Sequence, residues 1–523
     1  MPDGSAERNN PPAALHRPVF PEGRAARQRP SDAPCPERDR PYVLVATILA
    51  SAMAFIDSTV VTIALPALQD DLSASFSALQ WVVNAYALLL GGLILIGGGA
   101  GDRYGRKRIF LIGIVVFALS SLGCAIAPNV ETLILARAGK GIGAALLVPQ
   151  SLAIIAAAFP KDVRGRAIGI WAGASAITTA MGPPIGGFLI DVLDWRVVFW
   201  INLPLSAIAI LVTLRHVPES RNRSVDGPLD WPGGVLAVLG FGALTLGLTL
   251  ISEAQDMLLY AGAALVAGLA ALIGFLAVES RTPNPLVPLA LFRDRSFTSA
   301  NFMTLFLYGA LYGIMFLLPF DLIERRGFTA TEVGLVSLPI GIIIGVFSKL
   351  AGGAADRNGP RPFLVAGSLL VAGSAVLLGA NLDDFRFGVI APVLMLAFGM
   401  AMVVAPLTTA VMNAAADDNA GAASGVNNAA SRLAGLFAVA ILGSVASIVF
   451  SGAIGDGPGT GGTRFGVIPE DGNALRPAVE TAFLSAYSAA LWVAALWSGL
   501  AALIALLFLG PRARDRLHPA GRP

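Results

Sequence analysis

Charged residues are scarce in this sequence: Asp, Glu, Lys and Arg make up 13% of its 523 residues, whereas a soluble domain has about 25%. Three histidines and two cysteines are too few for a histidine-based metal site or a framework of disulfides. The formal net charge of +2 gives no indication of nucleic-acid binding. The sequence contains no G-x-x-x-x-G-K-[ST] motif, so nothing in it indicates an ATP-binding loop.

Apolar residues are abundant instead, at 55% of the chain, and they form long continuous runs. Continuous runs favour membrane helices over a β-barrel, whose strands would alternate in polarity. A spanning helix needs about 20 apolar residues. Fourteen such segments are predicted, near 43–67, 79–98, 109–127, 132–157, 167–190, 197–214, 232–251, 258–278, 298–320, 333–353, 363–380, 387–411, 422–449 and 484–509.

Basic residues between these segments predict how the chain crosses the membrane. If the N-terminus lies inside, the inner loops hold the clusters 103–108, 161–166, 215–223, 281–295 and 357–361, and the outer loops hold fewer arginines. Cytoplasmic loops carry the excess of Lys and Arg. We therefore expect fourteen spans in the cell membrane, with both termini cytoplasmic. The polar tails 1–41 and 511–523 should lie there too, the first as a disordered arm.

An internal repeat divides the chain. GAGDRYGRK at 99–107 and GAADRNGPR at 353–361 share one pattern, and GRAIG at 165–169 and GAASG at 421–425 recur at nearly the same separation. Both copies of the first pattern fall in inner loops, so the repeat is parallel. We predict an all-α membrane protein of six plus two plus six helices. Its parts are a six-helix bundle at 42–215, a linker with two extra helices at 216–297 and a second six-helix bundle at 298–510.

The first copy of this pattern resembles a known signature. GGAGDRYGRKR at 98–108 is similar to G-x-L-a-D-R-x-G-r-k of the major facilitator superfamily. Two parallel halves are also the layout of these transporters, whose substrate site lies between the halves near the middle of the membrane. A loop that only sets topology is the alternative. The resemblance implies a conformational gate on the cytoplasmic side, made by Asp102, Arg103, Gly105, Arg106, Asp356 and Arg357.

Two further stretches resemble proton-coupled exporters of this superfamily. LILARAGKGIGAALLVP at 133–149 is similar to R-x-x-Q-G-x-G-a-a, with Lys140 in place of the usual Gln beside the intramembrane Arg137. Two cations on one face of a helix either disfavour the charged form of Lys140 or demand an anion or carboxylate, unless Lys140 extends to the membrane surface. The segment 173–187 resembles the antiporter signature G-P-x-x-G-G, through Gly182, Pro183, Gly186 and Gly187. That signature implies export; tight helix packing is its simpler interpretation.

One carboxylate, Asp57, lies inside the first apolar run. The stretch IDSTVVTIALP at 56–66 resembles the first-helix signature D-x-T-V-V-N-x-A-L-P of fourteen-helix drug:proton antiporters, with Thr62 in place of Asn. Burial in a medium of low dielectric favours the neutral form of a carboxyl group, so such a residue can bind and release a proton. We expect Asp57 to carry the coupled proton and Arg137 to tune or displace it. A structural Asp bonded to Ser58, Thr59 or Trp81 is the alternative.

Other polar groups at membrane depth are candidates for lining a substrate cavity, or for simple bonds between helices. They are Asn84, Lys140, Gln150, Asn427, Asn428 and Arg432. The aromatic residues Phe302, Phe306, Tyr308 and Tyr312 are expected to face lipid, with contact to an apolar substrate as the alternative. Asp321 and Glu324 are expected to lie solvated at the outer rim.

The resemblance implies a proton-coupled antiporter, without enzymatic activity or a cofactor, that exports small hydrophobic compounds by alternating access. The proton gradient would supply the energy, and a monomer would suffice because the cavity lies within one chain. A metabolite or sugar exporter or uniporter of the same fold remains open. A membrane enzyme or receptor is disfavoured because no nucleophile–base pair, metal site or soluble signalling domain can be found.

Overall fold

The structure is a computed structural model that describes residues 35–509 except 222–228, 253–256, 284, 415–419, 456–462 and 470–472. The predicted tail 511–523 and most of the predicted tail 1–41 lie outside these residues. Within the described ranges the regular elements are helices, which confirms the predicted all-α fold. A 3₁₀ turn at Glu37–Asp39 leads directly into the first long helix.

The first bundle holds six long helices and one short one: α1 (Arg40–Asp71), α2 (Phe76–Tyr104), α3 (Arg106–Ala125), α4 (Val130–Ala158), α5 (Lys161–Val192), α6 (Val197–Trp200) and α7 (Asn202–His216). Local chemistry sets several of its boundaries. The side chains of Ser75 and Asn129 accept hydrogen bonds from Ala78 N and Thr132 N, and so cap α2 and α4. Gly105 has φ +111°, a conformation that few other residues tolerate, and it separates α2 from α3.

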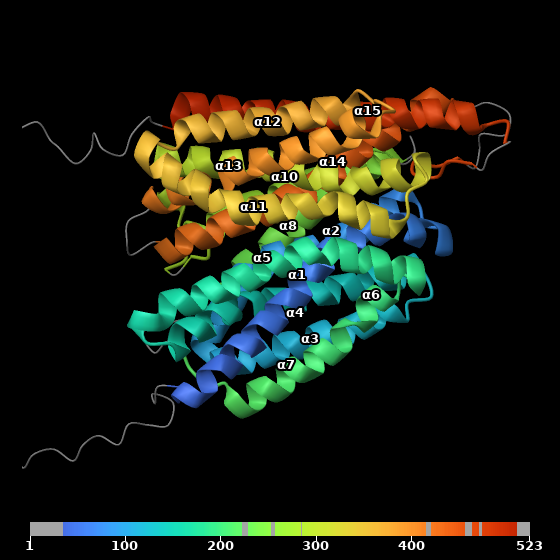
Figure 1. The fold of residues 1–523 in the computed structure, drawn as a ribbon. Helices are drawn as coiled ribbons and strands as arrows, with labels where there is room; N and C mark the ends of the chain where they lie inside the picture. Colours follow the sequence, from blue (N-terminus) through green and yellow to red (C-terminus); the bar gives the residue numbers. More distant parts are fainter. Residues whose placement is uncertain are drawn as a thin grey trace, which may run out of the picture.

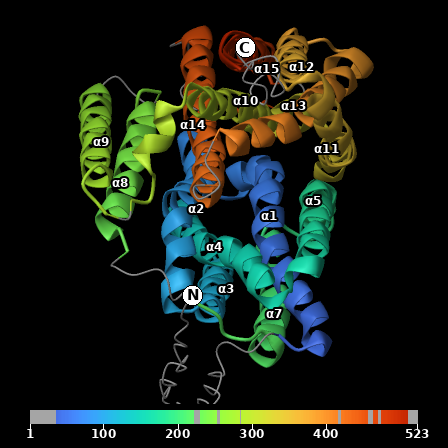
Figure 2. The same cartoon turned by 90° about the vertical axis from the view of Figure 1, so that its left-hand side faces the viewer.

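The linker contributes α8 (Trp231–Leu250) and α9 (Leu258–Glu279). Asp230 caps α8 by accepting a hydrogen bond from Gly233 N. The two helices pack on each other, and α8 also lies against α2 and α14, outside the line where the two bundles meet (Figure 2). In the most apolar window of α9 only 11% of the residues are buried inside the protein, which leaves most of that helix for lipid.

The second bundle holds α10 (Arg295–Phe320), α11 (Ala330–Asn358), α12 (Arg361–Gly379), α13 (Ala391–Asn413), α14 (Ala420–Ile454) and α15 (Arg476–Phe508). Short 3₁₀ or π turns at Leu289–Arg293, Asp321–Arg325 and Arg386–Ile390 lie beside them. Thr329 and Glu332 form a capping box at the start of α11. Gly359, with φ +85°, separates α11 from α12 as Gly105 separates α2 from α3, so the duplicated loop keeps one backbone conformation.

Thirteen helices of the described residues are long and apolar enough to cross a membrane. Because its glycines, prolines and threonines lower its mean hydropathy, α5 is not among them, although it has 32 residues and packs between α1 and α11. With α5 the count reaches the predicted fourteen. In Figure 1 α1 begins and α15 ends on the left, which we call the terminal side; the right is the opposite side.

The two bundles are in contact at the opposite side. The Asp191 carboxylate at the end of α5 accepts hydrogen bonds from Ala330 N (3.0 Å) and Thr331 N (2.8 Å) at the start of α11. A Cβ atom at Gly334 of α11 would overlap the Pro183 carbonyl of α5. Toward the terminal side, a Cβ atom at Gly173 or Gly345 would meet no described atom within 4 Å. The helices α5 and α11 therefore touch at one end and separate at the other.

Candidate functional site

Asp57 lies near the middle of α1, and both of its carboxylate oxygens bind cations of α4. Oδ2 accepts a hydrogen bond from Arg137 Nη1 at 2.5 Å, and Oδ1 pairs with Lys140 Nζ. All three residues are at most 2% exposed. The structure therefore brings together the predicted proton carrier and the two predicted intramembrane cations. Ser58 and Thr59, the alternative partners of Asp57, instead donate to backbone carbonyls of their own helix.

Helix geometry explains how α4 presents both cations to one carboxylate. Arg137 and Lys140 are three residues apart and share a face of α4. Glycines let this helix approach its neighbours closely. A Cβ atom at Gly141 would lie 2.7 Å from Tyr86 O, and one at Gly143 would lie 2.6 Å from Phe117 N. The motif glycines thus place α4 where its long basic side chains can reach α1.

Further contacts fix the two cations. Arg137 Nε donates to Val82 O at 2.9 Å, and the Arg137 guanidinium lies 4.5 Å from the centre of the Tyr86 ring. Lys140 Nζ donates to Ser121 Oγ at 3.0 Å and lies 4.6 Å and 4.8 Å from the rings of Phe117 and Phe199. One carboxylate and two cations leave an excess positive charge in a site sealed from water. A buried charge of this kind is costly, and release of a proton from Lys140 or the binding of an anion would neutralise it.

The duplicated loops differ in their ionic contacts. In the first copy, Asp102 Oδ1 accepts hydrogen bonds from Arg106 Nε at 2.9 Å and Arg106 Nη2 at 2.7 Å. Glu219, which follows α7, also accepts from Lys107 N and Arg108 N. These bonds close the loop within its own bundle. In the second copy Pro360 stands where Arg106 stands in the first, and among the described residues Asp356 forms no ion pair.

The motif of α5 lies at the contact with α1 and α11. A Cβ atom at Gly182 would overlap the Thr59 hydroxyl, one at Gly186 would overlap Val60, and one at Gly187 would overlap the Ala330 carbonyl. Pro183 lies within the helix and remains helical. The motif therefore permits the close contact between bundles at the opposite side, which is the tight packing that its small residues allow.

The remaining candidates occupy different environments. Lys140 and Gln150 are buried and bonded to neighbouring helices: Lys140 binds Asp57, and Gln150 donates to Gly97 O at 2.7 Å. Asn84 is fully buried, and its amide has no hydrogen-bond partner among the described residues. Asn427 donates to Asn301 and Thr304 of α10. Asn428 is exposed and Arg432 half-buried, and both lie on α14.

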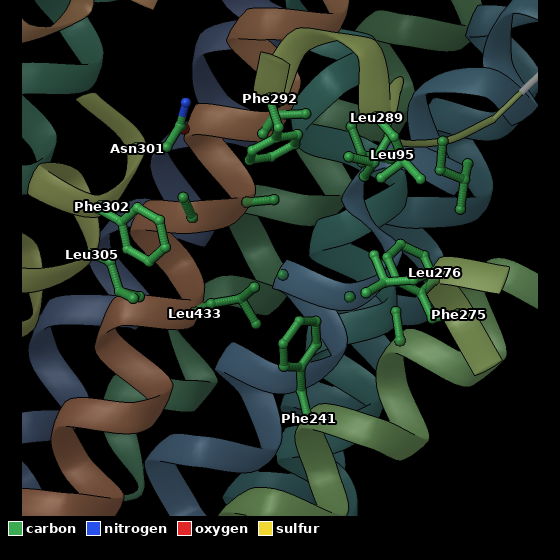
Figure 3. A pocket seen from close by; sticks show the side chains of 18 of the residues that line it. Leu95, Phe241, Phe275, Leu276, Leu289, Phe292, Asn301, Phe302, Leu305 and Leu433 are labelled. Carbon is green, nitrogen blue, oxygen red and sulfur yellow. The ribbon is translucent and has the colours of Figure 1, made fainter. Parts of the chain in front are cut away.

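An apolar pocket of about 530 Å³ lies beside the extra helices (Figure 3). Leu95, Phe241, Phe275, Phe302 and Leu433 project toward it from α2, α8, α9, α10 and α14. Its lining is almost wholly apolar, with Asn301 and Thr298 as the polar side chains. Phe302 thus lies in a pocket rather than simply against lipid as expected. The pocket does not include Asp57, Arg137 or Lys140.

Some polar contacts were not foreseen from the sequence. Asp321, expected to be solvated, is 1% exposed and binds Arg325 Nε at 2.5 Å and Arg326 Nε at 2.9 Å. The adjacent pair of arginines is the signal that could have indicated this network. Ser121 links Lys140 to Asn202, whose Nδ2 donates to Ser121 Oγ at 3.1 Å. Nothing local to Ser121 distinguishes it from other serines of the membrane helices.

Comparison with known proteins gives a consistent result. The model of the family described as Major Facilitator Superfamily matches residues 47–439. Multidrug resistance protein Stp of Mycobacterium tuberculosis is 34% identical over 413 residues, which cover 78% of this chain and 76% of that protein. The lincomycin resistance protein of Streptomyces lincolnensis is 34% identical over 424 residues, which cover 81% of this chain and 88% of that protein.

Solved structures agree at the level of the fold. A bacterial homologue of the human lysosomal transporter Spinster, in an inward-facing and unoccupied conformation, is 19% identical with a TM-score of 0.65. The match covers 93% of this chain and 100% of that structure. The D-xylose-proton symporter is 18% identical with a TM-score of 0.59, over 90% of this chain and 98% of that structure.

Proposed function

This chain belongs to the major facilitator superfamily, and we propose that it is a proton-coupled antiporter that exports small, largely apolar compounds. Members of this family are multi-pass membrane transporters and not enzymes. Several relatives are named for resistance to antibiotics, among them the lincomycin and methylenomycin A resistance proteins. Those names support efflux as the general activity of this chain, and the coupling must be argued from its own residues.

The buried group of Asp57, Arg137 and Lys140 is the observation that carries the proposal. In this conformation the carboxylate is ionised, because each of its oxygens accepts from a cation. A proton could bind Asp57 only if these contacts loosen, since a protonated carboxyl no longer attracts two cations. Proton binding and separation of α1 from α4 are therefore coupled. Such coupling is what an exchanger needs to convert a proton gradient into movement.

The contact between the two bundles is where the proposed movement takes place. The motif of α5 packs against α11 at the opposite side, whereas toward the terminal side a Cβ atom at Gly173 of α5 or at Gly345 of α11 would meet no described atom within 4 Å. If the terminal side is cytoplasmic, as the basic loops indicate, this conformation is open to the cytoplasm. It then corresponds to the state in which the proton has left Asp57 toward the inside and a substrate can enter. Rocking of the bundles would return Asp57 to the outside for a new proton.

The coupling can be measured in everted membrane vesicles. We expect wild-type vesicles with an imposed proton gradient to accumulate exported dyes, and to release protons when a substrate is added. Asp57→Asn should abolish both signals, because it removes the exchangeable proton. Asp57→Glu, which keeps a carboxyl group, should retain part of them. Asp162→Asn changes an exposed carboxylate at the start of α5 and serves as the matched control. Undiminished proton-coupled transport by Asp57→Asn would remove Asp57 from the mechanism.

A metabolite or sugar exporter or uniporter of the same fold is the second candidate. The structural likeness to a D-xylose-proton symporter is compatible with it at the level of the fold only. A protonophore separates the two candidates, because it collapses the proton gradient. Transport that continues unchanged with the protonophore would favour a uniporter or another coupling ion.

A further inference from the structure

We propose that anionic amphiphilic compounds bind beside Arg432, where α14 of the second bundle faces α2 of the first, and that Arg432 pairs with their negative group. This inference rests on the proposed function, because it assumes that the chain exports small compounds. It adds a chemical class of substrate to that function. It depends on Arg432 and its neighbours, whereas the proton coupling depends on Asp57.

Arg432 lies in the central part of α14 (Ala420–Ile454), where this helix of the second bundle faces α2 of the first. A Cβ atom at Gly91 of α2 would lie 3.2 Å from Arg432 Cβ, so the glycine makes room for the arginine. Arg432 is therefore placed between the bundles, where a transporter of this fold binds its substrate.

Arg432 has no anion of its own. Among the residues that the structure describes, it forms neither an ion pair nor a hydrogen bond, although it is only partly exposed. An unpaired arginine at membrane depth costs several kcal/mol and is rarely present without a use. The cost falls when a ligand supplies the missing negative charge, because a guanidinium binds carboxylates and similar anions through paired hydrogen bonds.

No carboxylate is available in the middle of the bundles to bind a cationic substrate. Asp57 is the acidic residue that lies near the centre of a described helix, and Arg137 and Lys140 occupy both of its oxygens. Together with Arg432, these groups give three positive charges and one negative charge near the middle of the membrane. A cation that approached these groups would be repelled by the excess positive charge in a medium of low dielectric, whereas an anion would be attracted to it.

Aromatic rings beside Arg432 can pack against the apolar part of such a ligand. Tyr308 and Tyr312 of α10 are half-buried, and their rings lie 6.3 Å apart. A Cβ atom at Gly435, three residues after Arg432, would lie 3.0 Å from the Tyr312 ring. In the described residues the hydroxyls of Tyr308 and Tyr312 accept or donate no hydrogen bond, so both can serve a ligand. Donors and ring faces together fit an amphiphile with one negative group.

Binding to the purified protein tests this inference apart from proton coupling. Fluorescein, an anionic xanthene dye, and rhodamine 6G, a cationic xanthene dye, are the probes, and fluorescence anisotropy gives their affinities. We expect the wild-type protein in detergent to bind fluorescein at least about tenfold more tightly than rhodamine 6G. Arg432→Gln should weaken fluorescein binding about tenfold or more, as expected for a lost charge-assisted hydrogen bond.

Two further variants control for folding and charge. Arg432→Lys keeps the positive charge but not the paired donors, and it should bind fluorescein more tightly than Arg432→Gln and less tightly than the wild type. Arg281→Gln makes the same change as Arg432→Gln at an exposed position after α9 and should leave binding unchanged. Tighter binding of rhodamine 6G than of fluorescein, or fluorescein binding that is unchanged in Arg432→Gln, would overturn the anion assignment. Neither result would affect proton-coupled export, which the vesicle experiment with Asp57→Asn tests separately.

Discussion

At the scale of single residues, the side chains of Asp57, Arg137 and Lys140 set the charge in the interior of the first bundle. Asp57 compensates two cations at once, and no other acid lies near the middle of the described helices. Removal of the Asp57 carboxylate must therefore lower the free energy of unfolding more than removal of either cation. Loss of Asp57 leaves Arg137 and Lys140 facing each other, whereas loss of Lys140 leaves a neutral pair of Asp57 and Arg137.

This asymmetry predicts an order of stability. Asp57→Asn should lower the free energy of unfolding by about 3 kcal/mol or more, because a buried charge loses its partner. Lys140→Gln, which places here the residue usual in the related motif, should cost about 1 kcal/mol or less. Thermal unfolding of both purified variants in one detergent gives the order. A lower midpoint for Lys140→Gln than for Asp57→Asn would contradict the charge count.

The sequence predicted part of this site and missed the rest for a physical reason. A charge in an apolar run stands out, so Asp57, Arg137 and Lys140 could all be found, and the need of Lys140 for a carboxylate followed from its position on α4. Ser121 and Asn202, which complete the site, are ordinary polar residues whose role depends on how α3 and α7 pack. Asp321 was misplaced because a carboxylate at a helix end is usually solvated, and here Arg325 and Arg326 fold back onto it.

At the scale of helices, glycine marks where two helices touch and where they part. Gly334 and Gly345 lie on the same helix, α11, but only Gly334 lies against α5. The contrast matters because closure of the opposite side requires backbone contact between these helices. The Gly and Pro residues of α5 predicted close packing. The same residues lower its mean hydropathy, so α5 is not among the thirteen helices that are apolar enough to cross a membrane.

A matched pair of substitutions tests this contact. Gly334→Ala should keep α5 and α11 apart at the opposite side, because its methyl group would overlap the Pro183 carbonyl. Gly345→Ala should leave the spacing unchanged, since its methyl group meets open space. Spin labels at Leu193 and Phe387, in a background with Cys35 and Cys124 replaced, would report the distance between the bundles by electron paramagnetic resonance. Equal distances in the two variants would show that close glycine packing does not hold this side together.

At the scale of the whole molecule, most of the predicted fold followed from the duplicated loop and from the distribution of charges along the sequence. The repeated loop defined two parallel bundles, and both copies indeed break at a glycine with positive φ, Gly105 and Gly359. The position of the two extra helices could not be predicted, because their apolar residues fit lipid and protein equally well. The structure places α8 against α2 and α14 and leaves α9 mostly to the membrane. The pocket of Figure 3 is a consequence of that placement.

Whether the two extra helices cross the membrane gives a last prediction. Leu259 and Val266 of α9 are 81% and 70% exposed, and such apolar surface is stable only in lipid, so α8 and α9 should both cross the membrane. Alkaline phosphatase, which is active only outside the cytoplasm, should therefore be active when fused after Ser252, between the two helices. Fusions after Val217 and Ser280 should be inactive, because the basic loops predict that these points lie inside. Similar activity at all three points would mean that the two helices do not cross, and the inverse pattern would place the terminal side outside the cell.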